Sequence, residues 1–148
     1  MAKTIRELGK DEKAFFLTGI VLLVLTLMDV VNMIVGNVKA TIEAQIETMN
    51  LTEEQLEVAD LIVWIGIFAI IISVLFRILL AIKAMQISKK PTKENLHIII
   101  AVIYLVISVY TLLDGVSTSS ITDILTSISN TVIVGFYVFI ANKVRASV

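Results

Sequence analysis

The sequence predicts an all-α integral membrane protein, a bundle of four helices that each cross the bilayer. Two observations carry this prediction. Hydrophobic residues make up 57% of the 148 positions and charged residues only 17%, whereas soluble domains average about half and about a quarter. The hydrophobic residues also gather in four long runs. The length leaves no room for a soluble catalytic domain beside four spans, so residues 1–148 are expected to form a single four-span transmembrane domain.

The spans are expected at about residues 15–34, 61–82, 96–113 and 124–141. A bilayer core of about 30 Å requires roughly 20 apolar residues in a helix, and each run is apolar on every face, as contact with lipid requires. The first run contains one charged residue, Asp29, and the second contains one, Arg77. The fourth is interrupted by Ser127, Ser129 and Asn130. The first run exceeds the apolar core of a signal peptide, so we expect it to be retained.

Basic residues predict the direction of insertion. All of them except Lys39 fall before the first span, at and after the end of the second, or after the fourth. Because Lys and Arg in short loops stay on the cytoplasmic side, both termini are expected in the cytoplasm. The short chain and its charge bias favour a bacterial plasma membrane.

Five basic residues are expected to bind lipid headgroups, each with about 1 kcal/mol of attraction: Arg77, Lys83, Lys89, Lys90 and Lys93. Arg77 lies in the inner half of its span, so we expect its long side chain to extend toward the headgroups. On this estimate of depth Arg77 is too far from Asp29 to pair with it, and the alternative is a buried pair with another subunit. His97 is expected to be an ordinary interfacial residue.

The segment 37–60 predicts a helical hairpin outside the membrane. Apolar residues recur at helical spacing before a turn at Asn50, and Thr52 with Gln55 matches a capping box. The first helix is therefore expected to continue outward, and the second to begin at Thr52 and run unbroken into the bilayer. Five apolar side chains are candidates for docking a partner: Ile42, Ile46, Met49, Leu51 and Leu56. A simple extension of two long helices is the favoured interpretation of this hairpin, and a docking surface is the alternative.

Two polar stripes lie within or beside the apolar runs. One consists of Thr26, Asp29 and Asn32, and the other of Ser108, Thr111 and Asp114. If the two stripes face each other, they would form one polar patch. Two carboxylates in that patch would either raise the pKa of at least one of them or recruit a cation. Helix packing and assembly are the favoured interpretation, and ion or proton handling is the alternative.

The residue inventory excludes several functions. The chain has no cysteine, which removes disulfides and thiol chemistry, and no phosphate loop, metal-ligand spacing or catalytic triad is present. We therefore expect no enzymatic activity, no cofactor and no metal. A net charge of -1 argues against a nucleic-acid partner.

The preferred hypothesis is a non-enzymatic accessory, assembly or immunity-type subunit. It would act through helix–helix contacts and contacts of the outer hairpin with a larger membrane complex, and its expected partners are the lipid bilayer and either another membrane protein or a second copy of this chain. The alternative is a small transporter or ion-conducting homo-oligomer that uses Asp29 and Asp114.

Overall fold

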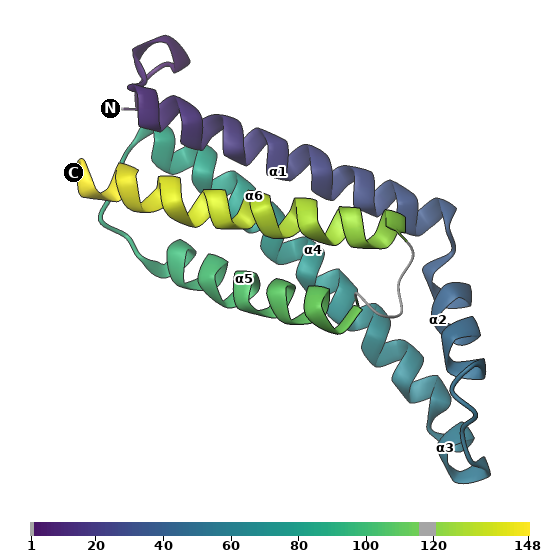
Figure 1. The fold of residues 1–148 in the computed structure, drawn as a ribbon. Coiled ribbons are helices and arrows are strands. Elements are labelled where there is room, and N and C mark those ends of the chain that lie inside the picture. The colour runs from purple at the N-terminus through teal and green to yellow at the C-terminus, as the bar shows by residue number, and fades with distance from the viewer. Residues whose placement is uncertain (1, 116–120) are drawn as a thin grey trace. The chain divides into compact units, whose positions relative to one another are not determined.

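All elements in the described part of the chain are helical. The structure, a computed structural model, describes residues 2–115 and 121–148 and the side chains of these residues except at positions 38, 41, 45, 114, 115, 122 and 123. The elements in chain order are the 3-10 helix η1 (Ile5–Glu7), α1 (Lys10–Val35), α2 (Val38–Glu47), α3 (Glu53–Glu57), α4 (Ala59–Lys89), α5 (Leu96–Gly115) and α6 (Ile121–Ala146) (Figure 1).

Four segments are long and apolar enough to cross a membrane: Lys10–Val35, Ala59–Lys89, Leu96–Leu113 and Ile124–Ala146. The predicted all-α class and the four apolar runs are therefore confirmed, including the fourth run with its polar interruptions. The chain is a multi-pass membrane protein.

The chain divides into two compact units. The first comprises Met1–Leu25 and Ile78–Val148, and the second comprises Thr26–Arg77. α1 and α4 each contribute to both units, whereas α5 and α6 belong to the first and α2 and α3 to the second.

The first unit has one core to which four helices contribute. α5 and α6 lie side by side in it (Figure 1). Its buried side chains come from α1 (Phe15, Leu22), α4 (Leu80, Ala81, Ala84, Ile87), α5 (Ile98, Ala101) and α6 (Val134, Tyr137, Ile140, Ala141, Val144). Small residues let α1 and α4 approach closely in this unit. The approach is so close that a Cβ atom on Gly19 would lie 2.8 Å from the Ala81 carbonyl oxygen. Such contacts between small residues are typical of helix pairs in membranes.

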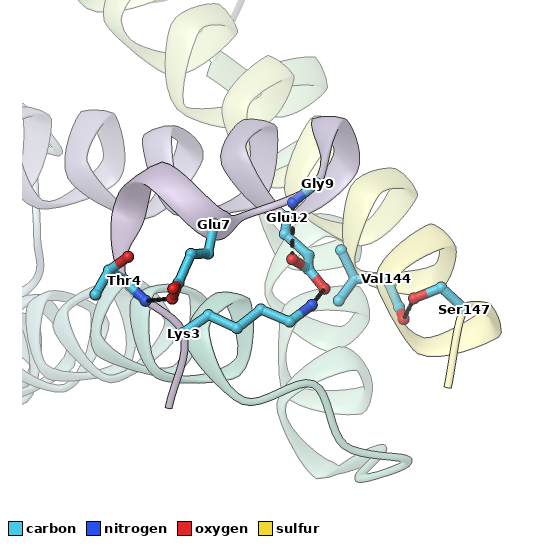
Figure 2. A network of polar contacts seen from close by, with 7 residues as sticks. All are labelled: Lys3, Thr4, Glu7, Gly9, Glu12, Val144 and Ser147. Atoms are coloured by element: carbon cyan, nitrogen blue, oxygen red, sulfur yellow. Dashed lines mark hydrogen bonds and ion pairs between the residues drawn. The ribbon is translucent and has the colours of Figure 1, made fainter. Parts of the chain in front are cut away.

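The N-terminal segment is folded onto the same unit. The Lys3 backbone N–H donates a hydrogen bond of 2.9 Å to the Lys89 carbonyl at the end of α4. The Lys3 ammonium group lies 2.7 Å from Glu12 Oε1, and Gly9 N–H donates to Glu12 Oε2 at 2.9 Å (Figure 2). Leu8 is buried. The segment therefore satisfies a carbonyl that the end of a helix leaves without an intrahelical partner.

Glu7 holds the short η1 helix in place. Thr4 N–H donates to Glu7 Oε2 at 2.8 Å, and the hydrogen bonds from the Thr4 backbone and side chain lower the pKa of Glu7.

Both termini lie at the same end of the first unit (Figure 1).

In the second unit the helices are interrupted where the sequence predicted continuity. α1 ends at Val35, and Asn37 adopts a left-handed conformation (φ 47°) and accepts a hydrogen bond from Ala40 N–H, starting α2 anew. Asn tolerates this conformation better than other non-glycine residues, which favours a break there. α3 likewise ends at Glu57, with Val58 as its C-cap, before α4 begins at Ala59. The predicted unbroken helices were wrong at these two points.

The start of α3 agrees with the sequence pattern. Thr52 N–H donates to Gln55 Oε1 at 2.9 Å, and Gln55 N–H donates to Thr52 Oγ1 at 3.4 Å, which completes the predicted capping box. Asn50 has a positive φ of 47°, a conformation that Asn tolerates in turns, and it lies at the predicted turn.

Candidate functional site

The charged residues of the first two apolar runs pair with each other in the second unit. Arg77 on α4 donates a hydrogen bond through Nη1 to Oδ2 of Asp29 on α1. The Arg77 side chain is 6% exposed and the Asp29 side chain 23%. The prediction that Arg77 lies too deep to reach Asp29, and extends to the headgroups instead, was therefore wrong.

The direction of the side chains explains the correction. In the second unit α1 and α2 run antiparallel to α4, because Ile42 lies against Gly66 while Asp29, earlier in the chain, meets Arg77, later in the chain. Each Cα–Cβ bond leans toward the N-terminus of its own helix. In antiparallel helices the Asp29 and Arg77 side chains therefore lean toward each other, and the length of arginine closes the remaining distance. Counting residues along a helix locates only the Cα atoms and does not include this lean of the side chains.

Pairing reduces the cost of placing two charges in a bilayer. Asp or Arg alone at the centre of a span costs about 2.5–3.5 kcal/mol in insertion experiments, and such residues normally pair inside a membrane protein. Arg77 is not fully satisfied, since its buried Nε has no hydrogen-bond partner among the described residues. The arrangement can hold α1 and α4 in register, but its cationic member is not placed to bind headgroups.

The other members of the predicted polar patch belong to different units. Thr26 is fully buried and Asn32 is exposed on α1 in the second unit. In the first unit Thr111 Oγ1 donates to the Ser108 carbonyl of its own helix at 3.0 Å. The side chain of Asp114 lies outside the described residues. A single patch formed by the two stripes stays a prediction.

The four lysines predicted to bind headgroups occupy the first unit. Lys83 pairs with Glu94 at 3.1 Å, and the Lys89 ammonium group lies 5.4 Å from the centre of the Phe16 ring. Lys90 and Lys93 are exposed. Headgroup binding by these lysines stays a prediction.

The predicted docking residues differ in exposure. Ile46 is buried, and Ile42 and Leu51 are half-buried. Met49 and Leu56 are 65% and 55% exposed. Only these last two are therefore available to a partner without rearrangement of the second unit.

Sequence reasoning missed a buried polar pair in the first unit. His97 Nδ1 and Tyr137 Oη share a hydrogen bond of 2.9 Å, and the Phe15 ring meets Tyr137 edge-on with centroids 5.0 Å apart. His97 is 2% exposed and is therefore part of the core rather than an interfacial residue. No local signal indicates the pair, since its members are 40 residues apart.

Tyr137→Phe is expected to lower stability by about 1–3 kcal/mol, because the buried His97 loses its partner. The matched control is Tyr110→Phe, whose ring is exposed and whose change should stay within about 0.5 kcal/mol. Circular dichroism during unfolding of the detergent-solubilised protein measures both. Equal effects from the two variants would contradict a stabilising hydrogen bond.

No group of three or more His, Cys, Asp or Glu side chains that could hold a metal ion is found where the chain is described.

No protein-family model matches the chain, and no curated protein or solved structure matches it.

Proposed function

We propose that this chain is a small non-enzymatic membrane protein that acts as an accessory, assembly or immunity-type subunit of a larger membrane complex. The observation that carries the proposal is the Asp29–Arg77 pair. A carboxylate beside a guanidinium has its charge compensated, so it lacks the free negative charge that would attract a cation into the bilayer. The pair thus favours a role in holding helices together over a role in transport.

The outward surface of the spans supports the same function. Large apolar side chains are exposed on each of the four span-length helices, among them Val24 on α1, Phe68 on α4, Ile103 on α5 and Val132 on α6. Lipid or the helices of another protein can cover such surfaces. Association of helices in a membrane needs only close packing and a few polar contacts, and this chain supplies the packing surfaces.

Photocrosslinking in cells tests the proposal. A photoreactive amino acid at Phe68 or Ile103, both exposed within spans, is expected to give an adduct with one defined membrane protein. The same amino acid at Val148, which is exposed beyond the last span, serves as the control and should give none. Adducts that contain only this chain, or no adducts at all, would overturn the proposal.

A flux measurement tests the transport alternative independently. If the purified protein conducts protons or cations in liposomes and Asp29→Asn abolishes that flux, the accessory function is wrong. The proposal predicts no flux above that of empty liposomes for either protein.

We further propose that both termini lie in the cytoplasm and the 37–60 segment outside a bacterial plasma membrane. The supporting observation is the charge bias: Lys39 is the only basic residue of that segment. Since the chain has no cysteine, a single introduced thiol reports its own side of the membrane. A membrane-impermeant maleimide should label Met49→Cys in intact cells, and Val148→Cys only after permeabilisation. The reverse pattern would overturn the orientation.

A further inference from the structure

The segment between the first two spans exposes apolar side chains that the spans do not account for. Met49 and Leu56 are 65% and 55% exposed, and Val58 is also exposed. All three lie outside the segments able to cross a membrane. Exposed apolar side chains outside the spans are candidates for contact with a partner protein.

The same segment of the chain is rich in acidic residues. The segment 36–60 has six acidic residues and one basic residue. The acidic side chains are all exposed: Glu43, Glu47, Glu53, Glu54, Glu57 and Asp60. The basic residue, Lys39, is 3.8 Å from Glu43. The surface therefore carries a negative charge that its own lysine offsets only in part.

Capping interactions give this surface a regular backbone. α2 begins at the Asn37 cap, and α3 begins at the reciprocal Thr52–Gln55 capping box. A surface that is helical before binding loses less conformational entropy on association than an unstructured acidic loop would.

We propose that α2, α3 and the turn between them form a docking surface for a basic amphipathic helix of a partner protein. Lysine and arginine side chains of that helix would face the carboxylates, and its apolar stripe would cover Met49 and Leu56. Charge complementarity accelerates such encounters and excludes wrong partners, and methionine adapts to an irregular apolar surface. A second copy of this chain would bring like charges together, as would an anionic lipid surface, so both are disfavoured.

This inference rests on the proposed function and specifies the partner's chemistry. The probe is a synthetic helical peptide with lysines on one face and leucines on the other, titrated onto the full-length protein in zwitterionic nanodiscs. Fluorescence anisotropy, corrected for binding to empty nanodiscs, reports the affinity. We expect binding at about 50 mM NaCl that weakens at least roughly tenfold at about 500 mM, and none for a peptide with glutamate in place of lysine.

Matched variants locate the binding surface. Met49→Ser combined with Leu56→Ser should weaken binding by about tenfold, whereas Ile5→Ser, at an exposed site outside the spans of the first unit, should change it less than about twofold. Glu53→Gln combined with Glu57→Gln should also weaken it by about tenfold. Asp11→Asn, an exposed charge of the first unit, is the charge control. Circular dichroism verifies that each variant retains its helices.

Three outcomes would overturn the inference. The first is equal binding of the lysine and glutamate peptides, and the second is equal effects of the surface variants and their controls. The third is binding of Ca²⁺ alone by the protein with the affinity and salt dependence found for the lysine peptide. Photocrosslinking then separates this failure from that of the proposed function. Adducts with a partner from Phe68 or Ile103, but none from Leu56, would leave the accessory function standing and remove the docking surface. Absence of adducts from every position would remove the accessory function, while peptide binding would be judged on its own titration.

Discussion

Asp29→Leu is expected to lower the free energy of unfolding by about 3–5 kcal/mol, the largest effect of any single substitution proposed for this chain. The change leaves the Arg77 guanidinium buried without a counter-charge, and removing one member of a buried ion pair typically costs this much. Arg77→Leu is also expected to lower the free energy of unfolding, because it leaves the Asp29 carboxylate without a counter-charge. Unfolding of the detergent-solubilised protein with increasing SDS, followed by circular dichroism, measures both variants.

The double variant Asp29→Leu/Arg77→Leu provides the decisive control. Replacing both members of a buried pair by apolar residues is often neutral or stabilising, so the double variant is expected to recover most of the lost stability. The coupling energy of the double-mutant cycle would then be several kcal/mol, well above the average of about 0.6 kcal/mol for polar contacts between membrane helices.

A different outcome would indicate a different position for Arg77. If its side chain extends to the headgroups, as the sequence alone suggests, Asp29→Leu would cost less than about 1 kcal/mol and the two substitutions would be additive. Additivity would therefore contradict the ion pair and remove the main support for the accessory function.

Gly19→Ala is expected to lower the free energy of unfolding by about 1–3 kcal/mol. The added Cβ would lie 2.8 Å from the Ala81 carbonyl oxygen and 3.0 Å from Ala84 Cβ. The first of these atoms is backbone, so α1 and α4 must separate within the first unit to admit it.

Gly135→Ala on α6 is the matched control for Gly19→Ala. A Cβ on Gly135 would lie 3.9 Å from Leu105 Cδ1, which is ordinary van der Waals contact. Both glycines lie inside helices, where alanine is preferred by about 1 kcal/mol, so Gly135→Ala should be neutral or stabilising. The same SDS titration compares the two variants, and a gain of stability from Gly19→Ala would contradict the close approach.

The sequence by itself determined the properties that depend on neighbouring residues. Four apolar runs of sufficient length are enough to predict four helices, because a chain in lipid must satisfy its backbone hydrogen bonds within each segment. The capping box at Thr52 and the turn at Asn50 are likewise local, and both are present in the structure. Continuity through Asn37 and Val58 was mispredicted, because apolar periodicity does not register a break of one or two residues.

Only the tertiary structure decided which polar residues meet. Asp29 and Arg77 are 48 residues apart, and His97 and Tyr137 are 40 apart. Their pairing depends on the register of packed helices and on the direction in which each Cβ leans. The same is true of Gly19 on α1, which matters because the backbone of Ala81 on α4 lies directly against it. Helix formation in a bilayer is a local requirement, whereas contact between helices is set by interactions among residues far apart in the chain.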